Sequence, residues 1–229
     1  IKTTMYCAVP TVLVMMQPDF GTAFVFICIM VFIYFIGRIS WGYILTAAGG
    51  LAVCMPLAYY FVLSDSQRER IDVFINPESD LQNSGYNVAQ SKIAIGSGQL
   101  TGKGFFSEGT LAQLRFVPER HTDFIFAGIV EGLGFVGGTI IICLFFALIF
   151  RWIYIAMRTK DSFGTCLVVG VAGMFTAHVF ENIGMTIGLM PVTGIPLPFI
   201  SYGGSNLLTN LIGVGIVENV WMRRQSKKR

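Results

Sequence analysis

Hydrophobic and polar positions divide this chain into long apolar runs separated by polar links. Five runs approach the ~20 residues that span a bilayer, and one further run is shorter. In chain order the six are Thr3–Met16, Gly21–Ile36, Trp41–Leu63, Phe124–Phe150, Phe163–Met190 and Leu207–Met222. The alternation of apolar and polar residues that marks barrel strands is missing from them. The pattern predicts an all-α polytopic membrane protein with about six transmembrane helices, forming one membrane domain over residues 1–229.

The composition supports this interpretation. Only 13% of the 229 residues are charged and 54% are hydrophobic, whereas a soluble domain is normally about a quarter charged. We therefore expect membrane lipids around the chain and no nucleic-acid partner. Because Ile1 is not an initiator methionine and no signal peptide precedes it, we also expect a fragment of a larger protein.

Basic residues predict the orientation in the membrane. If the six runs alternate, ten of the 16 Lys and Arg residues fall on one side, which we assign to the cytoplasm. Both ends of the chain lie there, and residues 222–229 form a basic cytoplasmic tail. The long link 64–122 is then a large extracellular loop containing short helices. Trp41, Trp152 and Trp221 lie at the basic ends of their runs, as interfacial anchors do.

The long link carries two features of interest. Its residues 85–96 mix aromatic, apolar and glycine positions, which favours a short interfacial helix. The following glycine-rich segment, 96–104, resembles a phosphate loop, but three residues separate Gly98 from Gly102 and a glycine follows Lys103. It is either a nest of backbone N–H groups that, with Lys103, lies near a lipid diphosphate, or a flexible turn.

Ionisable residues crowd the start of the fourth run. Arg115, Arg120, His121 and Asp123 lie close together in the sequence, and Glu131 follows about 12 Å further along the helix. Asp123 could cap that helix. A carboxylate buried in a membrane is costly, so Glu131 is a functional candidate by default.

Three other polar features remain open. Asp19 is either a turn residue with a helix cap or part of an outward-facing site. His178 and Glu181 share one helix face, as a helix contact, an internal salt link or a proton relay. Two histidines in the whole chain make a histidine-based metal site improbable. Residues 191–205 hold three prolines and several glycines, so they cannot form a continuous helix and must line a cavity or be buried in protein.

These motifs together resemble a known family. The stretches Gln17-Pro-Asp-Phe-Gly-Thr, Pro118-Glu-Arg-His-Thr-Asp-Phe-Ile-Phe, Asn182-Ile-Gly-Met and Pro196-Leu-Pro-Phe-Ile-Ser-Tyr-Gly-Gly-Ser are similar to signatures of the SEDS family of RodA, FtsW and SpoVE proteins. All occur in the expected order across the chain. The segment Gln90-Ser-Lys-Ile-Ala-Ile-Gly-Ser-Gly looks more like the elongation branch, RodA, than the division branch.

The resemblance implies a ten-helix protein whose fifth to tenth helices are these six. It implies an inverting glycosyltransferase in the bacterial cytoplasmic membrane that polymerises lipid II into glycan strands on the outer face, for cell elongation and shape. It also implies a class B penicillin-binding protein as partner. The essential carboxylate of the family falls on Asp123. The expected substrate-binding residues are Lys103, Arg115, Arg120, His121, Glu131, Asp19, Ser201 and Ser205. His178 and Glu181 match no family motif.

The chemistry fits these residue types. Making a β-1,4 bond from an α-linked sugar diphosphate requires a base that takes the proton from the acceptor 4-hydroxyl. The departing diphosphate needs positive charge, which a basic side chain or a divalent ion such as Mg²⁺ or Mn²⁺ could supply. No organic cofactor is expected. Two other functions stay open: a flippase that carries lipid II across the bilayer, and a non-catalytic scaffold of the elongation machinery.

Overall fold

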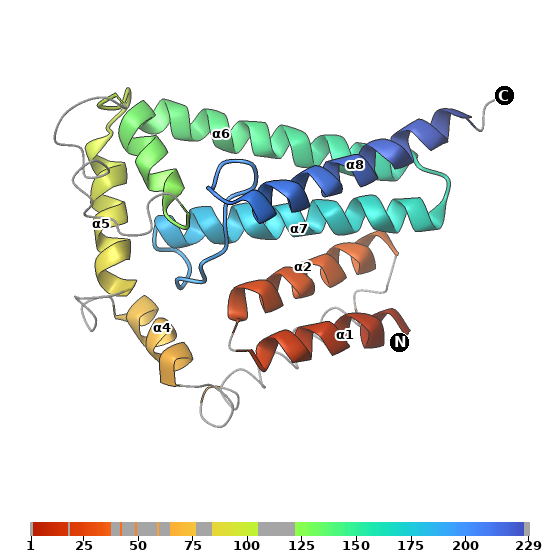
Figure 1. The fold of residues 1–229 in the computed structure, drawn as a ribbon, viewed down its shortest axis with the longest axis horizontal. Helices are drawn as coiled ribbons and strands as arrows, with labels where there is room; N and C mark the ends of the chain where they lie inside the picture. The colour runs from red at the N-terminus through yellow and green to blue at the C-terminus, as the bar shows by residue number, and fades with distance from the viewer. Residues whose placement is uncertain are drawn as a thin grey trace.

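The computed structural model describes residues 2–17, 19–37, 42, 49, 59, 65–76, 84–104 and 122–226. Within these ranges the chain forms helices and no strand (Figure 1). The helices are α1 (Lys2–Met15), α2 (Phe20–Ile36), α4 (Asp65–Ile75), α5 (Ser84–Ser97), α6 (Ile125–Arg158), α7 (Ser162–Thr186) and α8 (Gly204–Ser226).

Five of the six predicted runs coincide with a helix, namely α1, α2, α6, α7 and α8. The third run, Trp41–Leu63, lies outside the described residues except for single positions. Helices α6 and α7 are long and apolar enough to cross a membrane, while α2 and the Tyr6–Met15 part of α1 are shorter apolar helices. The fifth run ends earlier than predicted, at Thr186, because Gly188 adopts a φ of 74° that a helix cannot continue through.

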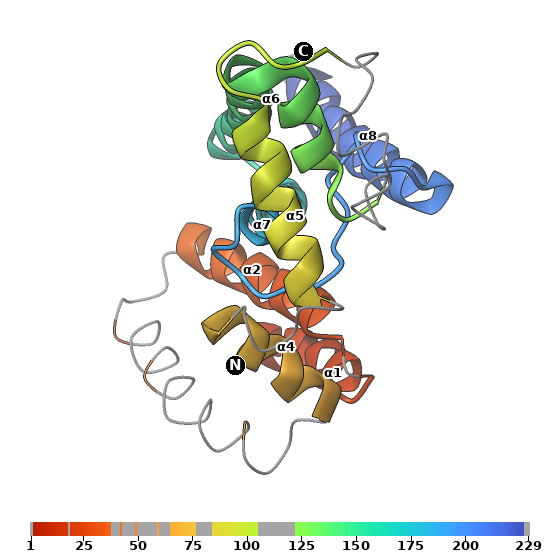
Figure 2. The ribbon, with the colours of Figure 1, turned by 90° about the vertical axis from the view of Figure 1, so that its left-hand side faces the viewer.

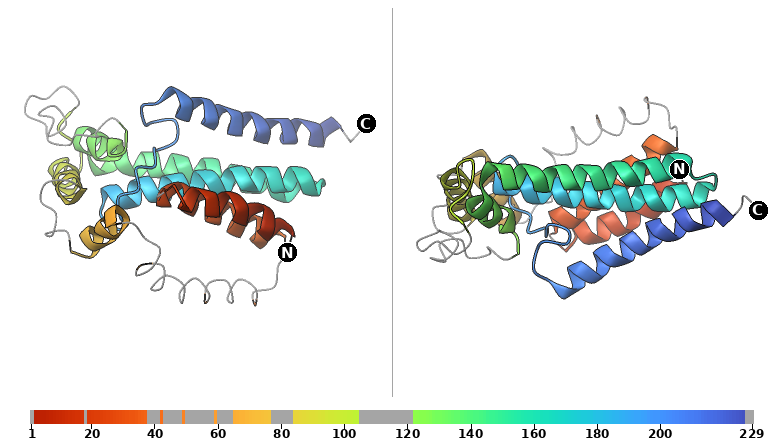
Figure 3. Two further views of the ribbon diagram at one scale, coloured as in Figure 1. Left: turned by 60° about the horizontal axis from the view of Figure 1, so that its bottom comes forward. Right: turned by 90° about the horizontal axis from the view of Figure 1, so that it is seen from above.

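The predicted outer links gather at one end of the bundle. The α1–α2 link, α4, α5, the start of α6 and the α7–α8 link lie there, whereas both chain ends and the α6–α7 link lie at the other (Figures 1 and 3). Helix α5 crosses this end of the bundle from α6 to α4 (Figure 2). Its residues Val88, Ser91 and Ala94 recur on one face and are buried. The short helix predicted in the long link is therefore present.

The opposite end of the bundle holds a hydrophobic core. Trp152 of α6 packs edge-on against Phe175 of α7 with ring centroids 4.6 Å apart, and Val217 of α8 joins them. Trp152 is only 2% exposed. Its prediction as an interfacial anchor is wrong, because helix packing encloses the ring instead of leaving it at the boundary. Trp221 is half-buried beneath the Arg151 guanidinium, 5.0 Å from its ring centroid, and Trp41 lies outside the described residues.

Helix α6 is broken where the glycine-rich segment meets it. Gly134 has φ 71° and ψ −172°, which interrupts the helical ladder. The N–H of Phe135 donates to Gln99 O at 2.8 Å, and the N–H of Lys103 donates to Glu131 O at 3.0 Å. Similar bonds join the backbones of residues 136 and 100 and of residues 104 and 132. The backbone N–H and C=O groups that lose their helical partners at the break therefore bond to the glycine-rich segment, as burial in a membrane protein requires.

Candidate active site

Asp123 lies in the turn just before α6, at the end of the bundle where the predicted outer links gather. The amide of Asn182, which is fully buried in α7, holds this turn. Its Nδ2 donates to Asp123 O at 2.9 Å and to Ile195 O at 2.8 Å. One side chain therefore fixes the Asp123 backbone to Ile195 of the α7–α8 link, which lies 13 residues after Asn182.

The α7–α8 link folds over the Asp123 turn. The Ser201 hydroxyl donates to Thr122 O at 2.7 Å and accepts from the N–H of Leu197 at 2.8 Å. Gly194, with φ 77°, lies where an added Cβ would be 3.4 Å from Asp123 Oδ2. The positive φ favours glycine here, and an added Cβ would be in ordinary van der Waals contact with the carboxylate. The predicted non-helical segment is therefore an ordered cover, and Asp123 is half-buried beneath it.

Capping does not explain Asp123. The N-cap residue of α6 is Phe124, and no side chain makes a cap hydrogen bond there. Phe124 is 1% exposed and packs with Val88 of α5 and Val192 of the α7–α8 link. A buried aromatic residue thus anchors the turn from below, so the neighbouring carboxylate is not needed at the N-cap position to start the helix.

Asp19 caps a helix, as one of the two interpretations of its position in the sequence predicts. It is the N-cap of α2, where its Oδ1 accepts from the N–H of Thr22 at 3.0 Å and its Oδ2 accepts from the Thr22 hydroxyl at 2.7 Å. The next turn still touches the site, because Gly21 packs directly against Thr193 and Ile195. A side chain at position 21 would displace the cover of Asp123.

The glycine-rich segment is not an open nest of N–H groups. The N–H groups of Lys103 and Gly104 donate to carbonyls of α6, and that of Gly102 donates to Gly98 O at 2.8 Å. A Cβ added at Gly98 or Gly102 would meet the α6 backbone. The glycines therefore permit a backbone-to-backbone contact, which contradicts the first of the two interpretations of this segment, an open nest of N–H groups facing a diphosphate.

Lys103 and Glu131 form an ion pair. The Lys103 Nζ lies 3.6 Å from Glu131 Oε1, and the Ser97 hydroxyl, which donates to Ala94 O at 2.9 Å, lies 3.4 Å from the same carboxylate oxygen. Glu131 is 1% exposed, whereas the Lys103 side chain is 39% exposed. The buried carboxylate thus has charged and polar partners, which offset much of the cost of its burial. The exposed part of Lys103 keeps access to solvent.

The other predicted site residues are less informative. Arg115, Arg120 and His121 lie outside the described residues. Ser205 lies exposed in the first turn of α8, and within the described parts of the chain no hydrogen bond joins it to the Asp123 turn. Ser201 is near Asp123, but its hydroxyl already bonds to Thr122 O in the Asp123 turn and to the N–H of Leu197 in the cover.

Glu181 and His178 face the inside of the bundle. Glu181 is fully buried, and neither of its carboxylate oxygens has a hydrogen-bond partner among the described residues. The same holds for Nδ1 of His178. An internal salt link between the two is therefore absent. Thr193 of the α7–α8 link and the Asp19 carboxylate both lie near Glu181, which places this carboxylate below the cover of Asp123.

The sequence places Asn182 only within a motif, yet a fully buried amide within an apolar helix must bond to something. No group of three or more His, Cys, Asp or Glu side chains in the described ranges is arranged to hold a metal ion. The described site is therefore one half-buried carboxylate in a turn whose backbone is held by side chains of α7 and of the α7–α8 link, with the Lys103–Glu131 ion pair between the glycine-rich segment and α6.

The chain belongs to the family of FtsW, RodA and SpoVE cell cycle proteins, whose family model matches residues 1–226. Over 216 residues it is 44% identical to peptidoglycan glycosyltransferase MrdB of Escherichia coli K12. The match covers 94% of this chain and 58% of that relative, so the chain spans somewhat more than half the length of the relative.

Two solved structures share the fold. One, described as the structural coordination of polymerization and crosslinking by a peptidoglycan synthase complex, has a TM-score of 0.78 at 30% identity, covering 97% of this chain and 61% of that one. The other, a mutant of the rod shape determining protein RodA of Thermus thermophilus, has a TM-score of 0.63 at 25% identity and covers 98% and 58%. The resemblance to the SEDS family and the all-α polytopic membrane fold are confirmed.

Proposed function

We propose that the protein carrying this chain is a peptidoglycan glycosyltransferase that polymerises lipid II, with Asp123 as the general base. The observation that supports the proposal is the way in which the fold positions the Asp123 turn. Asn182 and Ser201 donate to backbone carbonyls of its turn, Gly194 lies beside its carboxylate, and the start of the helix does not require that carboxylate. The 44% identity to a peptidoglycan glycosyltransferase supports the same reaction.

In the proposed reaction Asp123 accepts the proton of the acceptor sugar 4-hydroxyl. The hydroxyl oxygen forms a bond to the anomeric carbon of the donor, and the bond from that carbon to the lipid diphosphate breaks with inversion. The diphosphate leaves with the bonding electron pair. Lys103, Arg115 and Arg120 are the proposed sources of positive charge beside it. A divalent cation carried on the diphosphate would supply the same compensation.

The proposed site faces the outside of the cytoplasmic membrane. The end of the bundle that holds Asp123 is opposite the end that holds the α6–α7 link and the C-terminal end of α8, both rich in basic residues in the sequence (Figure 1). An excess of basic residues marks the cytoplasmic side. The role in elongation and the partnership with a class B penicillin-binding protein are also proposals. They are supported by the likeness to a structure that coordinates polymerization and crosslinking.

A flippase for lipid II is the second candidate, and one observation favours it. Buried atoms of His178 and Glu181 inside α7 have no hydrogen-bond partner among the residues that the structure describes, as a translocation path would allow. Against a continuous path, the cytoplasmic end of the bundle is filled by Trp152, Phe175 and their neighbours. A scaffold without catalysis would need none of the contacts that place Asp123.

Labelled lipid II incubated with the purified full-length protein, without other enzymes, separates the three functions. We expect glycan polymer in detergent, where no bilayer needs to be crossed. A flippase would make no polymer but would move lipid II between the leaflets of a liposome. A protein that does neither in the presence of its partners would overturn the proposal in favour of the scaffold.

A further inference from the structure

Two arginines lie near the end of α6 that leads into the α6–α7 link. Arg151 and Arg158 (the arginine pair) are about two turns apart on one face of the helix, with Tyr154 between them. Both side chains are exposed. Among the residues that the structure describes, neither guanidinium forms an ion pair or a hydrogen bond. The acidic residue that follows them, Asp161, instead accepts from the N–H of Gly164 and caps α7.

Aromatic rings position the arginine pair. The Cζ of Arg151 lies 5.0 Å from the ring centroid of Trp221 on α8 and 5.8 Å from that of Tyr154. The Cζ of Arg158 lies 5.2 Å from the centroid of the same tyrosine ring. An aromatic face attracts the positive charge, but it offers no oxygen to the five N–H donors of a guanidinium. The rings therefore hold two like charges close together and leave their donors for an anion.

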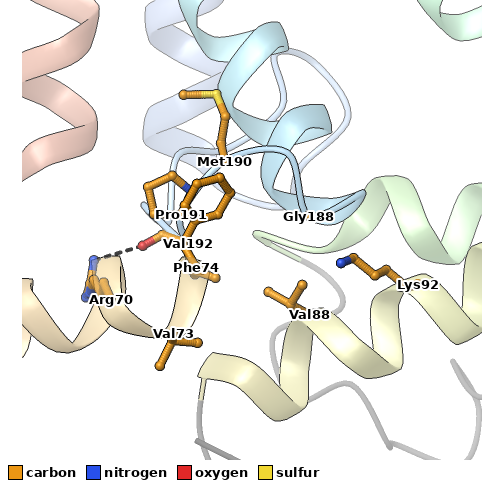
Figure 4. Close-up of a pocket in the computed structure, with 9 residues that line it drawn as sticks. All are labelled: Arg70, Val73, Phe74, Val88, Lys92, Gly188, Met190, Pro191 and Val192. Atoms are coloured by element: carbon orange, nitrogen blue, oxygen red, sulfur yellow. Dashed lines mark hydrogen bonds between the residues drawn. The ribbon is translucent and has the colours of Figure 1, made fainter. Parts of the chain in front are cut away.

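Exposed cations at the opposite end of the bundle are held differently. Arg70 of α4 donates through Nη1 to Val192 O at 3.3 Å, and Lys92 of α5 packs against Gly188 (Figure 4). These two side chains fasten α4 and α5 to the α7–α8 link. The N–H donors of the arginine pair have no such use in the described chain, so they are available to a ligand.

An exposed apolar stripe runs along α6 from the arginine pair toward the middle of the helix. Phe150 is 66% exposed, and Phe146, one turn earlier, is 58% exposed. Their ring centroids are 6.5 Å apart, as the spacing of four residues on one helix face allows. Because α6 is long and apolar enough to cross a membrane, this stripe faces the acyl chains of the bilayer.

The arginine pair lies at the level where acyl chains give way to headgroups. From the break at Gly134 to its last residue, Arg158, α6 rises roughly 36 Å at 1.5 Å per residue. The hydrocarbon core of a bilayer is only about 30 Å thick, so the last turns of α6 extend into the headgroup region. Long basic side chains also reach outward to that region. Cations above an apolar stripe therefore match the two parts of a phospholipid.

We propose that the arginine pair binds the phosphate of an anionic phospholipid, whose acyl chains lie along Phe150 and Phe146. The fork of N–H groups on a guanidinium matches the geometry of phosphate oxygens. The bound lipid belongs to the leaflet at the α6–α7 link, which is the cytoplasmic leaflet in the proposed orientation. The inference uses the membrane fold of the chain and does not depend on the glycosyltransferase reaction.

The charges favour an anionic lipid over a zwitterionic one. Phosphatidylethanolamine has the same phosphate but adds an ammonium group, which two guanidiniums without a paired carboxylate would repel. Phosphatidylglycerol has hydroxyl groups in that place and keeps its negative charge. An acidic protein segment would match the charges but would gain nothing from the apolar stripe.

The alternative is that the arginine pair has only a structural role. Arg151 would then fasten α8 to α6 through Trp221, and Arg158 would interact with the negative end of the α6 dipole. Substitution of the pair would change stability and leave lipid binding unaltered.

The test is native mass spectrometry of the purified full-length protein, titrated with phosphatidylglycerol or phosphatidylethanolamine in a neutral detergent. A neutral micelle has no surface potential, so the lipid that stays bound reports a site. The wild type should prefer phosphatidylglycerol. The double variant Arg151→Gln, Arg158→Gln should bind phosphatidylglycerol about tenfold more weakly or worse, as expected for the loss of charged hydrogen bonds to a phosphate, and should lose the preference.

Two further variants complete the design, with thermal unfolding measured on each. Lys160→Gln combined with Arg223→Gln removes two charges from the same end of the bundle and should bind both lipids as the wild type does. Arg158→Gln alone guards against a double variant that does not fold, because the ring contact of Arg158 is within its own helix. It should weaken phosphatidylglycerol binding by about threefold or more.

Wild-type affinity for phosphatidylglycerol in Arg158→Gln and in the folded double variant would overturn the site and leave the arginine pair as a structural contact. An equal loss in the Lys160, Arg223 variant would overturn it too, because the attraction would then belong to the whole basic end. Inorganic phosphate and hexaglutamate should not displace the lipid at equal concentration. Displacement by hexaglutamate would replace the lipid with an acidic protein segment as the ligand, and displacement by phosphate would remove any role of the apolar stripe.

Discussion

Replacing Asn182 with leucine tests whether the buried amide places the proposed base. Leucine has a similar size and suits an apolar helix, so the change removes the two hydrogen bonds to Asp123 O and Ile195 O with little change in volume. Each carbonyl left without its donor costs about 1–3 kcal/mol. We therefore expect Asn182→Leu to destabilise the protein by roughly 2–6 kcal/mol, and to release the Asp123 turn from the α7–α8 link.

The expected effect on activity is larger than the effect on the amount of folded protein. A displacement of about 1 Å at a catalytic group can cost about 10²-fold in rate. The assay is lipid II polymerisation by the full-length protein, expressed per folded molecule from a thermal unfolding curve. Asn210→Leu is the matched control, since Asn210 is an equally buried helix asparagine whose amide donates to Asn206 Oδ1 at 3.0 Å, away from the Asp123 turn.

The reasoning is refuted if Asn182→Leu polymerises lipid II as fast as the Asn210→Leu control. In that case the Asp123 turn would hold its position without the amide, and the two hydrogen bonds would serve only to anchor α7. A loss of rate shared equally by both variants would also count against the argument, because it would reflect the general loss of a buried polar group.

Three further predictions follow from particular contacts. Cysteine introduced by Ser84→Cys, in a cysteine-free background, should react with an impermeant thiol reagent from outside the cell, and Ser226→Cys should not; the reverse labelling contradicts the orientation. Gly134→Ala should lower the free energy of unfolding by about 1–3 kcal/mol or more, because its φ is positive and its space is filled by the glycine-rich segment, whereas Gly128→Ala, whose added methyl meets nothing within 4 Å, should have little effect in the same thermal unfolding assay. Lys103→Ala should reduce lipid II use by about tenfold and also destabilise its buried carboxylate partner. Replacing Glu131 with glutamine in the Lys103→Ala variant should restore stability but not activity. Recovery of both stability and activity would show that Lys103 is purely structural.

The parts of the fold that could be predicted from the sequence are those that depend on local patterns. Apolar runs of membrane length mark the helices because a bilayer demands internal hydrogen bonding. Asp19 followed by Thr22 allowed a helix cap, and the cap is present. The prolines and glycines of residues 191–205 ruled out a continuous helix, and the link indeed leaves helical geometry there.

The contacts that could not be predicted join residues far apart in the chain. The fourth run has the composition of one unbroken helix, and only its exchange of backbone bonds with residues 99–104 shows why Gly134 breaks it. Trp152 has the sequence position of an interfacial anchor, but its burial depends on the packing of α7 and α8. Apart from an amide within an apolar run, nothing in the sequence indicates that Asn182 bonds to two distant carbonyls.

The most direct test of the central claim is Asp123→Asn in the full-length protein. Asparagine keeps the shape of the side chain but cannot accept the hydroxyl proton as a base, so folding and membrane insertion should be normal. Polymerisation of lipid II should fall by at least ~10²-fold, the scale of losing a general base. A stable Asp123→Asn protein that still polymerises lipid II at close to the wild-type rate would show that Asp123 is not the base.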